Sequence, residues 1–400
     1  MAKVAVIIAP GFEEGEGLAL VDVFRRAEIE CDMVGLRSAE VAGGHEIVVR
    51  TDAVFDGSLT SYDMVVLPGG YGGADAMRDD DRFQAALREM DAAGKWVCAI
   101  CAAPIALDRA GILSGRRFTC YPGTVSKIED ETAQWVDEVV VRDGNLITSQ
   151  GPATAYAFAY ALVDALGVDS EPVKQRMVYY NAFDVDGGTP SWELPQGAWP
   201  SKGAHAPKQQ PLVVSKPKAA VLMVEGYEES ETMQIVDLLR RAEVQADTFR
   251  FQDDPFVHSM QGMYVKSDKV FGPEVGDYDL IVVPGGRTAA APLIANSEVM
   301  DTIRRFNEQG KLVCGMCSGT TVLEAAGVLA GKRATGYTGY GQKLSSAVFV
   351  ADEVAVWDRN VVTSQGPATP YPFAFKIMEA LGIDPSYIKG RLLYAKAGGR

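Results

Sequence analysis

The segment Lys95-Trp-Val-Cys-Ala-Ile-Cys-Ala-Ala-Pro-Ile-Ala-Leu-Asp-Arg-Ala-Gly111 decides the fold of this chain. Its apolar run from Trp96 to Ile100 predicts a buried strand, and residues 102–110 predict a helix that ends at Gly111. Cys101 therefore lies at a strand-to-helix corner, which is where a nucleophile elbow holds its nucleophile. Unpaired backbone N–H groups and the positive end of the helix dipole favour a thiolate at such a corner. We expect Cys101 to be a reactive thiol.

The same segment occurs again as Lys311-Leu-Val-Cys-Gly-Met-Cys-Ser-Gly-Thr-Thr-Val-Leu-Glu-Ala-Ala-Gly327, with Cys317 lying 216 positions after Cys101. Tyr62-Asp-Met-Val-Val-Leu-Pro-Gly-Gly and Thr148-Ser-Gln-Gly-Pro-Ala-Thr also return, 216 and 215 positions later. A repeat of this length is a duplicated domain. We expect one copy at residues 1–182 and the other at 218–400. The Pro- and Gly-rich stretch 183–217 is the predicted linker, and its Trp192, Leu194 and Trp199 favour a course along a domain surface.

Composition limits the class of protein. The 400 residues are 47% hydrophobic and 23% charged, and no apolar run reaches the roughly 18 residues that a membrane span needs. The first residues resemble a strand and not a signal peptide. A net charge of −15 argues against nucleic acid and anionic membranes as partners. Six cysteines are too few for a disulfide scaffold, so we expect a cytoplasmic protein.

The pattern within the first copy predicts an α/β fold. The predicted elements are strands at 4–8, 31–36, 64–67, 96–100, 136–142 and 146–149, helices at 16–27, 82–93, 102–110 and 156–166, and a small hairpin of 45–50 with 53–55. Alternating strands and helices predict a mostly parallel sheet with helices on both faces. Sites in such a sheet lie at the carboxyl ends of the strands, where Gly69-Gly70 and Cys101 fall.

Each copy offers an acid and a glycine pair beside the cysteine. Glu16 and Glu231 precede the apolar side of the first helix, so they should point inward, where a glutamate can act as general acid and base. A helix N-terminus also accepts such an acid for its dipole alone. Gly69-Gly70 and Gly285-Gly286 end a neighbouring strand. They serve either as a tight turn or as a source of N–H groups for an oxyanion, and both roles are compatible.

The cysteine spacing allows two other interpretations. Cys98-x-x-Cys101 and Cys314-x-x-Cys317 have the spacing of a redox motif, and four cysteines can hold zinc. Cys98 and Cys314 lie inside predicted strands, however, so the two thiols of each pair should diverge, and we predict no metal site. Cys120 has Gly336 as its counterpart, so only the first copy could use it to resolve an oxidised cysteine.

Taken together, the motifs give the chain a resemblance to the ThiJ/PfpI superfamily, and within it to the Parkinson-associated deglycase branch. The motifs that carry it are Gly-Phe-Glu-Glu-Gly-Glu, Val-Asp-Val-Phe-Arg-Arg-Ala, Leu-Pro-Gly-Gly, Ala-Ile-Cys-Ala-Ala-Pro and Thr-Ser-Gln-Gly-Pro-Ala-Thr. The resemblance covers both copies and leaves out only the linker. Fused tandem copies resemble the plant members of that branch.

The resemblance implies flavodoxin-like sandwiches, also described as class I glutamine amidotransferase-like, and a thiolate paired with a protonated glutamate. It assigns nucleophiles to Cys101 and Cys317 and the acids to Glu16 and Glu231. The implied oxyanion donors are Gly70 with Ala102, and Gly286 with Ser318. Family homodimers pack through the first helix, where an arginine reaches the neighbouring site. Arg26 and Arg241 hold that position, so the resemblance implies a pseudo-dimer within one chain and leaves a further homo-oligomer open.

The chain departs from the family at two positions. Tyr121 and Tyr337 stand where the branch often has a histidine, and a tyrosine is a poorer base at neutral pH. Ala102 and Ser318 follow the cysteines where peptidase-like branches have a histidine, and none of the three histidines recurs between the copies. A Cys-His protease is therefore disfavoured. The family's thiazole-phosphate biosynthesis label is disfavoured too, because no phosphate-binding loop is present.

Two functions follow from these residues. The first is a cofactor-free glyoxalase III or deglycase that acts on methylglyoxal or glyoxal, a small dicarbonyl. The second is a thiol-based oxidative-stress sensor or chaperone, because an exposed thiolate is also what peroxide oxidises. Lactate formed without glutathione would distinguish the enzyme from the sensor.

Overall fold

The computed structural model describes residues 2–182 and 209–398 and divides into two compact units. The first unit holds the chain up to Val173 together with the residues from Arg391 onward, and the second holds Lys174–Gly390. Residues 174–182, at the end of the first repeat, therefore belong to the second unit, and residues 391–398, at the end of the second repeat, belong to the first unit. No helix among the described residues has the length and apolar character that a membrane crossing needs.

Trp192, Leu194 and Trp199 of the predicted linker lie outside the described residues. The linker's end lies along the second unit, where the Leu212 N–H donates to the Ala380 carbonyl at 2.7 Å.

A seven-stranded sheet forms the first unit, in the order β10-β11-β7-β6-β1-β2-β5. All its pairs are parallel except β10 with β11 at one edge. The strands are β1 (Lys3–Ile8), β2 (Glu30–Gly35), β5 (Ala53–Val54), β6 (Met64–Leu67), β7 (Trp96–Ile100), β10 (Val140–Asp143) and β11 (Leu146–Ser149). Outside this sheet lie β3 (Glu40–Ala42), β4 (Val48–Arg50), β8 (Arg117–Phe118) and β9 (Gln134–Trp135).

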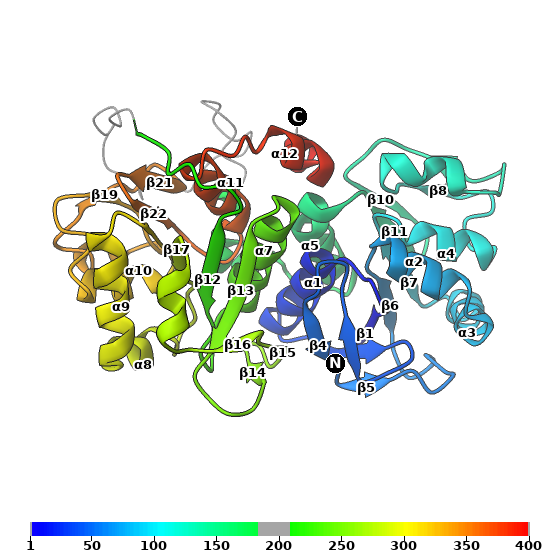
Figure 1. The fold of residues 1–400 in the computed structure, drawn as a ribbon. Helices are drawn as coiled ribbons and strands as arrows, with labels where there is room; N and C mark the ends of the chain where they lie inside the picture. The colour runs from blue at the N-terminus through cyan, green and yellow to red at the C-terminus, as the bar shows by residue number, and fades with distance from the viewer. Residues whose placement is uncertain (1, 183–208, 399–400) are drawn as a thin grey trace. The chain divides into compact units, whose positions relative to one another are not determined.

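The helices of the first repeat are α1 (Glu14–Arg26), α2 (Tyr71–Arg78), α3 (Asp81–Ala92), α4 (Pro104–Arg109), α5 (Ala155–Ala165) and α6 (Glu171–Met177). Helices α1 and α5 pack together, while α2, α3 and α4 lie on the other side of the sheet (Figure 1). The core between the sheet and α2–α4 includes Leu67, Phe83 and Leu107, all fully buried. The predicted α/β architecture is confirmed.

The second unit repeats this sheet as β16-β13-β12-β17-β18-β22-β21, again with one antiparallel edge pair. Its strands are β12 (Lys218–Leu222), β13 (Gln245–Arg250), β16 (Lys269–Val270), β17 (Leu280–Val283), β18 (Leu312–Met316), β21 (Ala355–Asp358) and β22 (Val361–Ser364). Short strands outside the sheet are β14 (Phe256–His258), β15 (Tyr264–Lys266), β19 (Arg333–Ala334) and β20 (Val348–Phe349).

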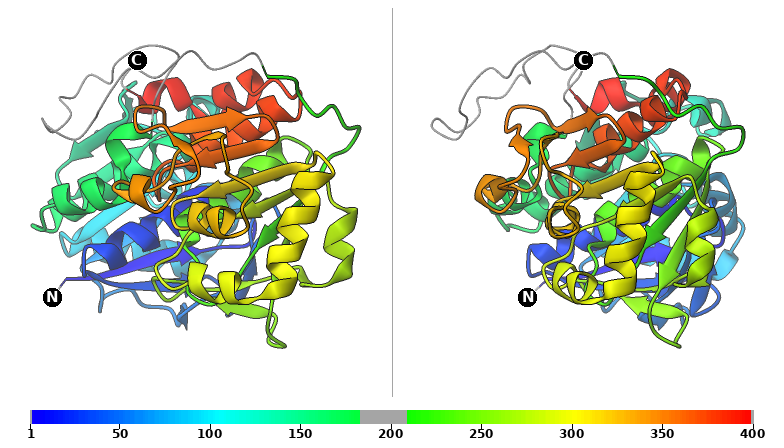
Figure 2. Two further views of the ribbon diagram at one scale, coloured as in Figure 1. Left: turned by 90° about the vertical axis from the view of Figure 1, so that its left-hand side faces the viewer. Right: turned by 60° about the vertical axis from the view of Figure 1, so that its left-hand side comes forward.

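The helices of the second repeat are α7 (Glu229–Arg241), α8 (Ala290–Ala295), α9 (Ser297–Glu308), α10 (Gly319–Ala325), α11 (Pro370–Ala380), α12 (Ser386–Leu392) and α13 (Tyr394–Ala397). Helices α7 and α11 pack together, as α1 and α5 do in the first unit. In the left view of Figure 2, α8 and α9 lie in front of the sheet, so helices cover both of its faces.

One predicted hairpin is wrong. The segment 48–50 pairs not with 53–55 but antiparallel with β3, through Val41 opposite Val49. Gly43 and Gly44 lie in the turn between these strands, and the Gly43 N–H donates to the Ile47 carbonyl. Residues 53–54 instead extend the main sheet beside β2. Thr51 and Asp52 lack the positive backbone angles of a tight hairpin turn, so the chain crosses from one sheet to the other there.

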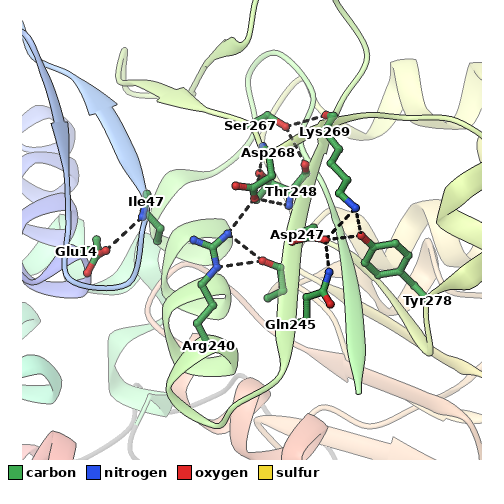
Figure 3. Close-up of polar contacts among 11 residues, drawn as sticks. Glu14, Ile47, Arg240, Gln245, Asp247, Thr248, Ser267, Asp268, Lys269 and Tyr278 are labelled. Carbon is green, nitrogen blue, oxygen red and sulfur yellow. Dashed lines mark hydrogen bonds and ion pairs between the residues drawn. The ribbon is translucent and has the colours of Figure 1, made fainter. Parts of the chain in front are cut away.

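A polar cluster around Asp268 joins β13 to α7 in the second unit (Figure 3). The Asp268 carboxylate accepts the N–H and the hydroxyl of Thr248, each at 2.8 Å, and Arg240 Nη2 at 2.9 Å. Asp52 makes the corresponding contacts with Met33 N and Arg25 in the first unit. Each carboxylate thus satisfies a strand N–H and fixes the end of the first helix.

We expect Asp268→Ala to destabilise the second unit by about 1–3 kcal/mol, because it leaves the Thr248 N–H and Arg240 without their acceptor. The matched control is Asp301→Ala, which removes an exposed pair with Arg304 and should cost at most about 0.5 kcal/mol. Urea unfolding followed by circular dichroism measures both. Equal midpoints for the two variants would contradict this role of Asp268.

Candidate active site

The two cysteines at the strand-to-helix corners have a strained backbone. Cys101 follows β7 with φ 61°, and Cys317 follows β18 with φ 52°. A non-glycine residue in this left-handed region is uncommon and typically marks a functional turn. Both side chains are partly exposed, whereas the other four cysteines are buried. The corner itself is as predicted, although the helix begins only at Pro104, three residues after Cys101.

Glu16 lies beside Cys101, as the inward orientation of its helix predicts. The Glu16 carboxyl is fully buried and raises the pKa of the neighbouring Cys101 thiol. Its Oε2 accepts the Gly69 N–H at 2.7 Å. A Cβ on Gly69 would lie 2.5 Å from the Cys101 Cβ and 2.7 Å from Glu16 Oε2, so only glycine permits this approach.

The second repeat builds the same contact. Glu231 raises the pKa of the neighbouring Cys317 thiol, and its Oε2 accepts the Gly285 N–H at 2.6 Å. A Cβ on Gly285 would lie 2.6 Å from Glu231 Oε2 and 2.7 Å from the Cys317 Cβ. Two stretches of chain about 215 residues apart in sequence therefore arrange the same three groups in the same way.

The electrostatics correct one expectation. Burial, together with the Glu16 carboxylate, raises the pKa of the Cys101 thiol well above its usual range, although an N–H from Gly70 acts in the opposite direction. The pKa of the Cys317 thiol is raised for the same reasons, by burial and by Glu231. The backbone donors and the helix start alone therefore do not produce a thiolate. Burial and the neighbouring negative charge oppose the effect of these donors, and the prediction did not include either of them.

The thiol and the carboxyl must instead be treated as one titrating pair. With one proton between them, the pair is either a thiol with a carboxylate or a thiolate with a carboxylic acid. When the proton is on Glu16, the negative charge that opposes the thiolate is gone and the acid can donate to the sulfur. Since Glu16 Oε2 accepts from Gly69, the other carboxyl oxygen is the one placed to carry that proton.

Gly70 and Ala102, the predicted oxyanion donors of the first repeat, lie next to Cys101. Gly70 has φ 84° and immediately precedes α2, a helix that the sequence analysis missed. A Cβ on Gly70 would lie 2.4 Å from the Gly11 carbonyl oxygen, so the strand end passes close to the β1–α1 loop. Ala102 is buried, and its nitrogen would lie 3.0 Å from a Cβ on Gly69. Gly70 and Ala102 thus both lie at the carboxyl edge of the sheet, next to Cys101.

The predicted tyrosines flank the elbows. The Tyr121 N–H donates to the Cys101 carbonyl at 2.9 Å, and the Tyr337 hydroxyl donates to the Arg176 carbonyl at 2.9 Å. Tyr340 was missed by the sequence analysis. Burial and the nearby Cys317 raise the pKa of its phenol, which places Tyr340 close to the second site. Its only sequence signal is the spacing Tyr337-x-x-Tyr340.

The last segment of each repeat contacts residues close to the elbow of the other repeat. In the first unit, a Cβ on Gly151 would lie 3.2 Å from Leu393, and the Arg391 guanidinium lies 5.8 Å from the Tyr121 ring. In the second unit, a Cβ on Gly366 would lie 2.9 Å from Val178. Val178 and Leu393 share the same left-handed backbone, with φ 60° each. The last segment of each repeat therefore packs against residues that neighbour the other repeat's elbow.

The structure also shows contacts of the remaining predicted residues. Arg26 Nε donates to Asp22 at 2.7 Å and Arg241 Nε to Asp237 at 3.0 Å, so both arginines pair within their own helix. Cys98 and Cys314 are fully buried inside β7 and β18, where burial raises their thiol pKa values far above the usual range. The redox and zinc interpretations of these cysteines lose their basis, because neither thiol is accessible.

Comparison with known protein families identifies both repeats. A match to the DJ-1/PfpI family covers residues 2–165 and 217–380, one match for each repeat. This chain belongs to the DJ-1/PfpI family. The resemblance that the motifs carry is thereby confirmed.

Three members of the family show what the chain is similar to. Protein DJ-1 homolog B of Arabidopsis thaliana is 28% identical over 94% of this chain and 84% of its own length, so the tandem arrangement is shared with a plant relative. A deglycase of Pyrococcus horikoshii is 34% identical over 41% of this chain and 99% of its own. The crystal structure of Drosophila melanogaster DJ-1beta, at 36% identity, covers 44% of this chain and 98% of that one with a TM-score of 0.41.

We expect Gly69→Ala to slow alkylation of Cys101 by at least about tenfold, because the added methyl group displaces either the sulfur's carbon or the Glu16 carboxyl. Iodoacetamide labelling with peptide mass spectrometry reads both elbows in one molecule, so Cys317 serves as the internal control and should label at its usual rate. Gly276→Ala is the matched variant, since a Cβ there meets nothing within 4 Å. Unchanged labelling of Cys101 would refute the close approach.

Proposed function

We propose that this chain is a cofactor-free, cysteine-dependent enzyme that converts methylglyoxal or glyoxal into the corresponding hydroxy acid, an activity of the glyoxalase III or deglycase type. The observation that carries the proposal is a buried glutamate carboxyl next to a cysteine on a positive-φ elbow, both packed against the same glycine, in each of the two repeats. Membership of the DJ-1/PfpI family and the likeness to a relative named deglycase support it.

The reaction begins with the pair in its thiolate and carboxylic acid form. The Cys101 sulfur adds to the aldehyde carbon of methylglyoxal, and the carbonyl π electrons move to the oxygen. The N–H groups of Gly70 and Ala102 stabilise the resulting oxyanion, and the proton of Glu16 neutralises it. The product of this step is a hemithioacetal and a Glu16 carboxylate.

The carboxylate then acts as the base. Glu16 removes the proton from the former aldehyde carbon and returns it to the neighbouring carbon, while the hydroxyl proton of the hemithioacetal passes to the ketone oxygen. The ketone thereby becomes an alcohol and the hemithioacetal becomes a thioester. The aldehyde carbon is oxidised and the ketone carbon is reduced within the same molecule, so no external oxidant is needed. Water hydrolyses the thioester, releasing lactate and the free thiol. Glyoxal gives glycolate by the same steps.

The setting of this activity is also part of the proposal. The two repeats pair as the two copies of a family homodimer do, in a cytoplasm that keeps the thiols reduced. The substrate is a small uncharged dicarbonyl, and Tyr121 and Tyr337 take the place of the family histidine as hydrogen-bond donors. Neither a metal nor an organic cofactor enters the steps.

We expect the reduced protein to form lactate from methylglyoxal without glutathione, because the chain's own thiol replaces it. Replacing both Cys101 and Cys317 by alanine should abolish turnover, while each single variant retains the activity of the other site. Chromatographic measurement of lactate decides the matter, with Cys98→Ala as the control for loss of a buried thiol. Wild-type protein that forms no lactate would remove the proposal.

Glu16→Gln in a Cys317→Ala background should lower kcat by roughly 100-fold or more, because the amide can neither give nor take the proton. The matched control is Glu13→Gln, which changes an acid next to the same helix start. Iodoacetamide should still label Cys101 in the Glu16→Gln protein. Full turnover in that variant would show that another group moves the proton.

A second function, oxidative-stress sensing, is favoured by one observation: of the six cysteines, only Cys101 and Cys317 are partly exposed. In that case mild peroxide should add 32 mass units, two oxygens, to these two thiols and spare the buried Cys31 and Cys120. Peptide mass spectrometry after a peroxide titration measures this. Equal oxidation of all four would exclude selective sensing.

A further inference from the structure

The two sites differ in the three residues after the cysteine. Ala102-Ala103-Pro104 follows Cys101, whereas Ser318-Gly319-Thr320 follows Cys317. The Ser318 hydroxyl donates to the Gly286 carbonyl at 2.9 Å, a bond that Ala102 cannot make to Gly70. A side chain of the second elbow thereby holds the glycine that is the counterpart of Gly70.

The backbone at Gly286 differs from the backbone at Gly70, its counterpart in the first repeat. Gly286 has φ 135° where Gly70 has 84°, so the peptide groups on either side of this glycine are oriented differently in the two sites. An N–H from Gly70 acts to lower the pKa of the Cys101 thiol, whereas an N–H from Ser318 acts to lower that of Cys317. The backbone group that favours the thiolate thus differs between the two sites.

The second elbow also lies closer to the neighbouring strand. A Cβ on Gly319 would lie 2.1 Å from the Val283 carbonyl oxygen and 2.7 Å from that of Pro284, so the second repeat requires glycine here. The first repeat has Ala103 at this position and accommodates its methyl group. This difference is independent of the serine hydroxyl and shows that the two elbows are packed differently.

We propose that Ser318 is a positioning residue that turns the Gly286 N–H away from the reacting atoms, so that the two sites are unequal and the first site carries most of the dicarbonyl turnover. An oxyanion donor contributes roughly 100- to 1,000-fold to kcat in acyl-transfer sites, so a site with one donor misdirected is slower by that order. The part of this inference that concerns turnover rests on the proposed function. The part that concerns the thiol does not.

The thiol is tested first, without substrate. The pH dependence of iodoacetamide labelling is followed at Cys101 and Cys317 in the same molecules by mass spectrometry. We expect two separate profiles in the wild type. Ser318→Ala should move the Cys317 profile about one pH unit lower, because the released Gly286 N–H becomes a second donor to the thiolate, and should leave Cys101 unchanged.

Two further variants control this result. Ala102→Ser introduces the hydroxyl into the first site and should move the Cys101 profile upward. Thr321→Ala removes a neighbouring hydroxyl that donates to the Ser318 carbonyl and not to Gly286, and it should move neither profile. Coincident wild-type profiles, or a Cys317 profile that Ser318→Ala leaves in place, would overturn the proposal whatever the enzyme's substrate is.

Turnover is tested in proteins with one working site. The Cys101→Ala protein should form lactate about 100-fold more slowly than the Cys317→Ala protein, and Ser318→Ala in the Cys101→Ala background should recover at least about tenfold. Equal rates from the two single-site proteins would refute the inequality. Lactate from neither, combined with the expected labelling shifts, would refute the proposed function and leave the role of Ser318 intact.

Discussion

The close approach of a buried carboxyl to a cysteine sulfur is the constraint on which each repeat depends. Two groups that both gain negative charge can share a buried site only if they share a proton. This approach requires the short loop after β1 to lead into α1 so that Glu16 points into the sheet edge. It requires the elbow to adopt φ 61° and the neighbouring strand to end in glycine. The strain at Cys101 and the missing side chain at Gly69 are thus two consequences of one contact.

The duplication shows which parts of this arrangement are fixed and which are free. The acid, the cysteine and the first glycine of each pair keep the same contacts in both repeats. The residues that hold the second glycine have changed, and with them the backbone at Gly286. A fused pair of sites tolerates such change because one site can retain the original geometry while the other departs from it.

Much of the fold follows from the sequence pattern because strands and helices alternate with little ambiguity. Residues 64–67 and 96–100 form strands with the predicted ends, since both are short apolar runs bounded by turn residues. Helix α2 escaped notice because its segment, Tyr71-Gly-Gly-Ala-Asp-Ala-Met-Arg78, holds two glycines, which are poor helix formers. The hairpin at residues 45–55 was mispaired because short strands carry no register information beyond their turns.

Sequence patterns predicted which residues form the candidate site, but they did not predict the raised pKa of its thiol. The positions of Cys101, Glu16 and Gly70 follow from the edge of the sheet at which their elements end. The raised thiol pKa depends on how deeply the sulfur lies and on which carboxyl oxygen faces it, and no sequence pattern reports either. Tyr340 and the contact of Leu393 with Gly151 depend on packing between segments distant in sequence.

The placement of Arg391 and Leu393 in the unit of the first repeat has a consequence for biosynthesis. A chain leaves the ribosome from its N-terminus, and domains generally fold in that order. The first repeat is complete in sequence long before residues 391–398 are synthesised, yet these residues belong to its compact unit. The unit that is begun first is therefore completed only after the whole second sheet has been translated.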